Sequence, residues 1–236
     1  MKVDKFRTVI IYIIIILLGL VCLLPLLNIV AISFSSSAAV EGNMVGLIPV
    51  GFSTAAYKKI LEDSQFWHSF LISVERVVLT LIINFVLIVL MAYPLSKTNA
   101  QFRGRNIYAN LMIFAMLFNG GMIPTFLLVK SYGLLNTVWA LVLPGAVPIF
   151  NVILVMNFFA AVPKELEEAA FIDGANPLQV LTKIFIPISK PVLATVSLFS
   201  IVGSWNDFYS GLIYMSKATY YPLMTYIQIC RSTWKI

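Results

Sequence analysis

Charged residues, cysteines and histidines are scarce in this sequence. Charged side chains make up 11% of the 236 residues, whereas soluble domains typically carry about 25%. Hydrophobic residues make up 60%, and the mean hydropathy is +0.94. The chain is therefore too apolar for a soluble domain of this length, and we expect it in a lipid bilayer.

The scarce residue types exclude several kinds of site. The two cysteines, Cys22 and Cys230, offer neither a CxxC pair nor a disulfide framework. The one histidine, His68, has no second ligand at metal spacing. The sequence has no GxxxxGKS/T phosphate-binding loop, so any ATP hydrolysis must come from a partner chain. We expect no metal, no cofactor and no catalytic centre.

The formal net charge of +6 could indicate nucleic-acid binding, but the basic residues lie in short clusters between apolar runs and not along one stripe. With a cytoplasmic N-terminus, the inner segments hold Lys2, Lys5, Arg7, Lys97, Arg103, Arg105, Lys164, Lys183 and Lys190. The outer segments hold Lys58, Lys59, Lys130, Lys217, Arg231 and Lys235. Because Lys and Arg favour cytoplasmic loops, this modest excess predicts a cytoplasmic N-terminus.

Five apolar stretches reach the roughly 20 residues that cross a hydrocarbon core of about 30 Å. They cover residues 9–32, 70–95, 107–129, 137–160 and 191–215. The first exceeds the roughly 7–15 apolar residues of a cleavable signal peptide, so we expect it to remain as an anchor. The predicted fold class is all-α, a polytopic bundle of transmembrane helices that forms one domain over residues 1–236.

Proline and glycine mark places within these stretches where a helix would kink or break. These residues are Pro94, Gly120, Gly121, Pro124, Pro144, Gly145 and Pro148. Two interpretations stay open for Pro124 and Pro144. A broken helix can line a water-filled pathway that satisfies the freed backbone groups. Alternatively, these residues only kink ordinary membrane helices, in which Gly and Pro are common.

Residues 162–190 form a polar island between the fourth and fifth stretches. Pro163 suits a first helical turn, and the three glutamates that follow complement the positive end of the helix dipole. Gly174 permits a left-handed turn that ends this helix. Asn176 can cap a second short helix, which Pro187 ends. The island is predicted to be a helix-turn-helix at the membrane surface, and an amphipathic hairpin that only anchors the chain to headgroups is the alternative.

The spacing within this island resembles the EAA loop of ABC importer membrane subunits. The resemblance rests on Glu168, Ala169, Ala170, Asp173, Gly174, Ile184 and Pro187. Ile186 stands where the family usually has leucine. The resemblance implies that residues 164–176 are a coupling helix seated in a cleft of a separate ATPase. Glu168 would pair there with a basic residue, while the small Ala169, Ala170 and Gly174 let the helix lie close.

The resemblance extends over Phe118–Phe159 and Phe199–Met215 to carbohydrate-importer permeases of the maltose type, in the branch for complex or acidic, alginate-like or lipoprotein-linked sugars. It implies a type I importer permease of MetI-like fold in the bacterial cell membrane. Such a chain is half of a heterodimer, with two ATP-binding subunits below and an extracytoplasmic sugar-binding lipoprotein above. It would translocate an oligosaccharide by alternating access between two states that ATP binding biases.

Polar residues at membrane depth are the candidates for substrate contact. Trp205, Asn206, Asp207 and Tyr209 are expected within about one turn of the fifth span, and Asn119 is a further candidate. Asp207 is the strongest, because burying a charge in lipid is costly. For the asparagines, including Asn84, Asn151 and Asn157, hydrogen bonding between helices is the favoured interpretation. Glu75 and Arg76 are interpreted as interfacial anchors or as partners for other helices.

Three other functions are alternatives. Permeases of this kind normally have a sixth span, whereas this sequence ends soon after YPLMTYIQ, so we expect five spans and a truncated C-terminus. A non-functional truncated permease is therefore one alternative. A secondary transporter would be expected to show inverted repeats with paired midplane charges. A membrane enzyme would need a catalytic constellation at one interface. The sequence supplies neither pattern convincingly.

Overall fold

The computed structural model describes residues 5–118 and 120–233, so the candidate Asn119 lies outside the described residues. The described residues form helices joined by turns and loops, with no β-strand among them, which confirms the all-α fold class. Internal contacts divide the described residues into two compact units, one up to residue 67 and one from residue 68 onwards. The single domain over the whole chain stays a prediction.

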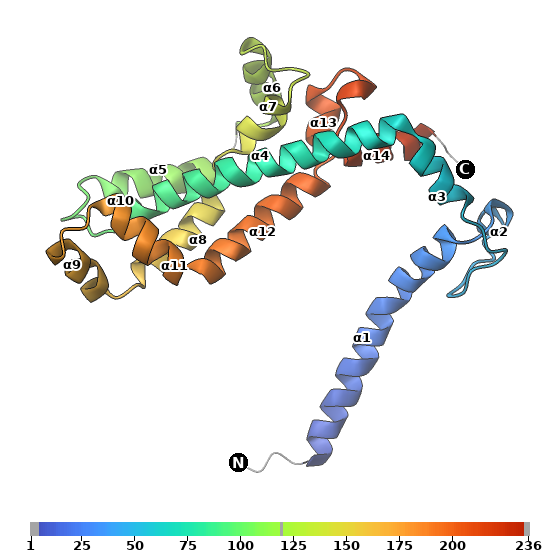
Figure 1. The fold of residues 1–236 in the computed structure, drawn as a ribbon, viewed down its shortest axis with the longest axis horizontal. Helices are drawn as coiled ribbons and strands as arrows, with labels where there is room; N and C mark the ends of the chain where they lie inside the picture. The colour runs from blue at the N-terminus through green and yellow to red at the C-terminus, as the bar shows by residue number, and fades with distance from the viewer. Residues whose placement is uncertain (1–4, 119, 234–236) are drawn as a thin grey trace. The chain divides into compact units, whose positions relative to one another are not determined.

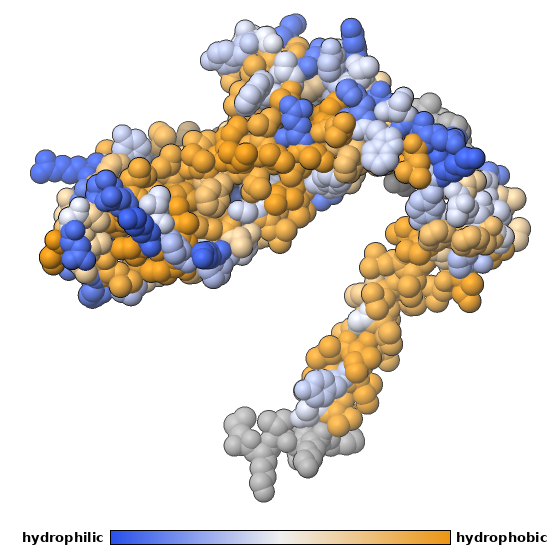
Figure 2. All heavy atoms as spheres, viewed as in Figure 1, coloured by the Kyte–Doolittle hydropathy of each residue, from blue (hydrophilic) through white to orange (hydrophobic). Residues whose placement is uncertain are grey.

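The first unit contains a long apolar helix followed by a short helical loop. Its helices are α1 (Lys5–Ser33), α2 (Ser37–Glu41) and α3 (Ala55–Glu62). Apolar side chains are exposed along the length of α1, and Figure 2 shows them on the visible face of this helix, as expected of a helix that lipid or other helices surround. The Asn28 amide fixes the following loop by donating hydrogen bonds to the carbonyl oxygens of Val45 and Gly46, at 3.3 and 2.6 Å.

The second unit is a bundle built along α4 (Figure 1). Its long helices are α4 (Ser64–Leu95), α5 (Arg105–Leu117), α8 (Ile149–Ala160) and α12 (Lys190–Asn206). Its shorter helices are α6 (Met122–Ser131), α7 (Val138–Val142), α9 (Lys164–Ile172), α13 (Tyr209–Tyr214) and α14 (Leu223–Thr233). One more helical segment, Pro177–Ile188, consists of α10 (Pro177–Val180), five π-helical residues and α11 (Ile186–Ile188).

Apolar side chains from four parts of the chain form the main core of this bundle. Ala92 of α4, Val155 of α8, Val180 of α10 and Val196 of α12 are all fully buried in it. Figure 2 shows apolar side chains along the visible side of the bundle and polar side chains gathered towards its two ends. The helices α9 and α10 lie at one end of α4, and α13 lies towards the other (Figure 1).

The candidate membrane spans take two forms among the described residues. The helices α1 and α4 are each long and apolar enough to cross a membrane alone. Three pairs of helices are also long and apolar enough to cross a membrane when each pair is counted as one span. The helix axis bends by 109° between α5 and α6, by 48° before α8 and by 84° before α12. The first two bends fall at residues 118–121, which include Gly120 and Gly121, and at residues 146–148, which include Pro148. Pro94 does not interrupt α4, because it lies one residue before the end of that helix.

The prediction of one continuous span over residues 191–215 is wrong. The helix α12 ends at Asn206, and Asp207 has an extended backbone, with φ −77° and ψ 97°. The Asp207 carboxylate accepts hydrogen bonds from the backbone N–H and the hydroxyl of Ser210, at 3.1 and 2.6 Å. Such local bonds compete with helix propagation. The chain therefore turns at Asp207 before α13 begins.

A substitution at Gly211 tests the packing of α13 on α14. An added Cβ would lie 2.9 Å from the Cβ of Thr225 and 3.0 Å from the Cδ of Pro222. Gly211→Ala should therefore force the two helices apart and cost about 1–3 kcal/mol, measured by thermal unfolding in detergent. Gly203→Ala, with nothing within 4 Å of its added Cβ, is the control and should keep or slightly raise stability. Equal losses in both variants would contradict the packing.

Candidate functional site

The polar island folds as the predicted helix-turn-helix. Gly174 follows α9 with a φ of +81°, in the left-handed region that favours glycine. The Asn176 side chain accepts a hydrogen bond from the Gln179 N–H, and the Gln179 side chain accepts one from the Asn176 N–H, both at 2.9 Å. This capping box starts the second helical segment. The segment runs one residue past Pro187, to Ile188, and not to Pro187 as predicted.

The side chains that carry the EAA resemblance lie mainly on the outside of this loop. Glu168, Ala169, Asp173, Gly174 and Pro187 are exposed, and Ala170 and Ile184 are half-buried. Two large apolar side chains, Ile172 and Leu178, are also exposed, by 86% and 62%. Contiguous exposed apolar surface beside polar residues is typical of an interaction site. The loop thus exposes charged, small and apolar side chains.

Glu167, the neighbour of Glu168, turns inward instead. One carboxylate oxygen, Oε2, lies 2.7 Å from the Lys97 Nζ, and the other accepts a hydrogen bond from the Tyr93 hydroxyl at 3.3 Å. The Lys97 Nζ lies 4.1 Å from the centre of the Tyr93 ring and 4.2 Å from that of the Phe185 ring. Burial lowers the pKa of the Lys97 ammonium, while the hydrogen bond and charge of Glu167 oppose that shift. We call Tyr93, Lys97, Glu167 and Phe185 the anchor cluster.

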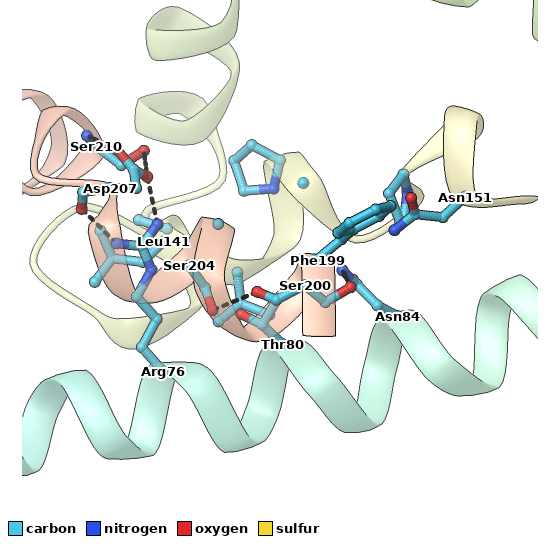
Figure 3. A pocket seen from close by; sticks show the side chains of 16 residues that line it. Arg76, Thr80, Asn84, Leu141, Asn151, Phe199, Ser200, Ser204, Asp207 and Ser210 are labelled. Carbon is cyan, nitrogen blue, oxygen red and sulfur yellow. Dashed lines mark hydrogen bonds and ion pairs between the residues drawn. The ribbon is translucent and has the colours of Figure 1, made fainter. Parts of the chain in front are cut away.

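A polar cavity of about 260 Å³ lies further along α4 (Figure 3). Its polar lining comes from α4, α8, α12 and the start of α13. These residues are Arg76, Thr80, Asn84, Asn151, Ser200, Ser204, Asp207 and Ser210. Pro144, Gly145 and Pro148, at the break before α8, also line it. The predicted interruption of the fourth span therefore borders a polar cavity.

Asp207 is the one described member of the predicted substrate set that lines this cavity. Trp205 packs edge-on against Phe70, with ring centres 6.0 Å apart. The Asn206 amide donates to the Val202 carbonyl of its own helix, at 3.0 Å. The Tyr209 hydroxyl donates to the Met122 sulfur at 3.3 Å. The structure therefore does not bring these three residues together with Asp207 in the cavity.

Several cavity residues were not predicted as site residues, and Arg76 is the charged one among them; the others include Thr80, Ser200, Ser204 and Ser210. Arg76 is buried, and its guanidinium donates to the Asp207 carboxylate at 2.5 Å and to the Asp207 carbonyl oxygen at 2.9 Å. This pairing confirms the interpretation of Arg76 as a partner for another helix. The available signal was an arginine inside an apolar stretch, since intramembrane charges are functional candidates by default.

Three polar atoms in the cavity have no hydrogen-bond partner among the described residues. They are the Arg76 Nε, the Thr80 Oγ1 and the Asn84 Oδ1. Their residues are more than nine-tenths buried, with exposures of 4%, 7% and 4%. Because buried polar groups are normally hydrogen-bonded, these atoms are available to a hydrated or hydroxyl-bearing occupant. Figure 3 shows the three side chains rising from one side of α4 towards α12.

Residues 84–234 match the model of a protein family described as "Binding-protein-dependent transport system inner membrane component". The chain belongs to this family. It is 44% identical to Protein LplC of Bacillus subtilis (strain 168) over 205 residues, which cover 87% of this chain and 69% of LplC. It is 40% identical to the polygalacturonan/rhamnogalacturonan transport system permease protein YtcP of the same organism, over 95% of this chain and 78% of YtcP.

A solved structure agrees with this assignment. The fold is similar, with a TM-score of 0.90 and 33% identity, to a chain in the crystal structure of a bacterial ABC transporter involved in the import of the acidic polysaccharide alginate. The match covers 100% of this chain and 84% of that one. The protein is thus an inner-membrane permease subunit of an ABC importer. Members of this family are membrane components of a transporter and are not themselves enzymes. Such permeases work with a partner permease, an ATPase and a substrate-binding protein.

Removing Arg76 from the Arg76–Asp207 pair should be destabilising. Arg76→Met leaves the Asp207 charge without its counter-ion, but the Asp207 side chain is 30% exposed, so the loss should lie below the roughly 3–5 kcal/mol of a fully buried pair. The double variant Arg76→Met/Asp207→Asn removes both charges, so it should recover much of that loss. Thermal unfolding in detergent measures both. Equal stability of the single variant and the unaltered chain would show that the pair does not stabilise the folded protein.

Proposed function

We propose that this chain is one half of a heterodimeric permease that imports an oligosaccharide across the bacterial cell membrane by alternating access. Two separate ATP-binding subunits hydrolyse ATP, and an extracytoplasmic sugar-binding lipoprotein delivers the sugar. The N-terminus and the loop 162–190 face the cytoplasm. The observation that carries this proposal is the exposed coupling-loop surface at one end of α4, with a polar cavity further along the same helix.

The coupling loop suits the docking of a separate ATPase. Glu168 is exposed, so it is free to meet a basic residue of that partner. A Cβ added at Gly174 would meet nothing within 4 Å in this chain, and Ala169 is also exposed. Contacts inside this chain therefore leave room for a larger side chain at Ala169, whereas the left-handed backbone of Gly174 already requires glycine. The small size of Ala169 fits a partner surface that lies close against α9.

The cavity suits a hydroxyl-bearing substrate. A sugar hydroxyl both donates and accepts hydrogen bonds, so it can pair with the Arg76 Nε–H, the Thr80 hydroxyl and the Asn84 carbonyl oxygen. Asp207 neutralises Arg76, so the site is polar with little net charge. Its volume of about 260 Å³ lies below the roughly 300–1,000 Å³ of sites for drug-sized ligands. We therefore infer that it admits one sugar ring at a time.

The names of the relatives support a carbohydrate as the substrate. YtcP is named for polygalacturonan and rhamnogalacturonan, and the solved transporter is described as importing alginate. Both names refer to polysaccharides that contain acidic sugars. We propose that this chain carries an oligosaccharide of the same broad class.

Reversing the charge of Glu168 tests the coupling role. Glu168→Lys places a positive charge where the ATPase is proposed to present a basic residue, so uptake should fall at least tenfold, equivalent to about 1.4 kcal/mol. The measurement is ATP-driven uptake of a labelled oligogalacturonate by proteoliposomes that contain the complete importer. Glu165→Lys, on the same exposed helix but outside the EAA spacing, is the matched control. Similar losses in both variants would contradict a specific role for Glu168.

Removing the Thr80 hydroxyl separates a substrate role from a structural one. The hydroxyl oxygen has no partner among the described residues, so Thr80→Val should stabilise the protein by about 1 kcal/mol. Uptake should nevertheless fall, because the substrate loses a hydrogen bond. Thr195→Val, at an exposed position outside the cavity, is the control and should keep normal uptake. Unchanged uptake in Thr80→Val would show that this hydroxyl does not contact the substrate.

A further inference from the structure

The anchor cluster joins the coupling loop to α4 by contacts between residues far apart in the sequence. Lys97 lies two residues beyond α4, and Glu167 lies on α9, 70 residues later. The exposed fractions of their side chains are 12% and 10%. The Tyr93 hydroxyl comes from the last turn of α4 and binds the same carboxylate. One buried carboxylate of the loop is therefore bonded twice to the end of one long helix.

Aromatic rings extend this attachment to the second half of the loop and to α8. Phe185, from the helical segment after Gly174, packs edge-on against Tyr93, with ring centres 5.1 Å apart. The same ring packs edge-on against Phe159 of α8 at 5.4 Å. Phe185 and Phe159 are 3% and 2% exposed. Both halves of the coupling loop thus converge on the end of α4.

A buried ion pair resists separation more strongly than an apolar contact does. Pulling Glu167 away from Lys97 would leave two charges without partners in a site that largely excludes water, which is costly. The loop can therefore move as a unit only if the end of α4 moves with it. The covalent route from the loop to α12 is less direct, because the helix axis bends by 84° where the loop segment meets α12.

The helix α4 can carry such a displacement to the polar cavity. It is continuous from Ser64 to Leu95, and it contributes Arg76, Thr80 and Asn84 to the cavity. Arg76 precedes Tyr93 by 17 positions, which at 1.5 Å per residue corresponds to about 26 Å along the axis. A shift of the anchor cluster is thus transmitted along one rigid element to the residues that are proposed to bind sugar.

We propose that Lys97 and Glu167 are positioning residues that make α4 follow the coupling loop, so that ATPase closure moves the cavity through α4 as well as through α12. This proposal rests on the proposed function, because it concerns how movement of the coupling loop reaches the cavity in that importer. It assigns adjacent glutamates different tasks. Glu168 faces the ATPase, and Glu167 fixes the loop to the helix that lines the cavity.

The test uses the complete importer in lipid nanodiscs. Its variants are Glu167→Lys, Lys97→Glu and the exchanged pair Lys97→Glu/Glu167→Lys. One readout is the stimulation of ATP hydrolysis by the sugar-loaded binding protein. The other is the distance between spin labels at Leu71→Cys on α4 and Leu198→Cys on α12, with and without ATP and vanadate, after Cys22 and Cys230 are replaced by serine. Both labelled positions are exposed, by 63% and 56%.

Each single reversal should reduce the stimulation at least threefold and alter the nucleotide-dependent change in distance, because α4 no longer follows the loop. The exchanged pair should restore both, because it re-forms the ion pair with opposite polarity. Glu62→Lys is the control, since Glu62 pairs with Lys58 at 3.9 Å on an exposed helix, and it should change neither readout. Normal stimulation and a normal distance change in the single reversals would overturn the proposal.

A conservative variant decides the result if the single reversals fail to assemble. Glu167→Gln keeps a hydrogen-bonding group of similar size but removes the charge, so it should assemble and show reduced coupling. Full coupling in an assembled Glu167→Gln importer would overturn the proposal. The unaltered chain is measured first. If it shows no stimulation at all, the proposed function itself fails, which is a different outcome from normal stimulation that survives loss of the ion pair.

Discussion

Charge buried in an apolar bundle needs a partner inside that bundle, and this requirement shapes the second unit. In hydrocarbon, water cannot solvate polar groups, so they must be satisfied by other parts of the protein. Arg76 meets this requirement by binding both the carboxylate and the carbonyl oxygen of Asp207. The carboxylate also accepts a hydrogen bond from the backbone N–H of Ser210. The end of α12, the start of α13 and the position of α4 are therefore fixed by one group of polar contacts.

Features that depend on nearby residues could be predicted from the sequence. The loop over residues 162–190 is the best example, because the left-handed turn at Gly174 and the capping box of Asn176 with Gln179 each involve residues within a few positions of one another. The apolar runs that became α1 and α4 are similarly local signals. Motif spacing within residues 162–190 also identified the family, because that spacing reflects a surface built from one short segment.

Features that depend on distant contacts could not be predicted in this way. The partner of Arg76 lies 131 residues away, and hydropathy gives no hint that a carboxylate will end α12 at that point. The apolar run continues past Asp207, so length and composition favoured one span over residues 191–215. The sequence also could not show that Thr80, a common residue in apolar helices, would lie beside Asn84 and Arg76 with its hydroxyl unpaired in a cavity.

The adjacent positions Glu167 and Glu168 explain how a short helix can present a surface to a partner. Successive residues on a helix point about 100° apart, at 3.6 residues per turn, so one glutamate can face the bundle while the next faces outward. The helix α9 has nine residues, and isolated helices shorter than roughly 12–15 residues are marginal in water. It therefore needs an anchor before it can offer a defined docking surface. The buried Glu167 supplies that anchor, so the outward geometry of Glu168 depends on the inward ion pair with Lys97.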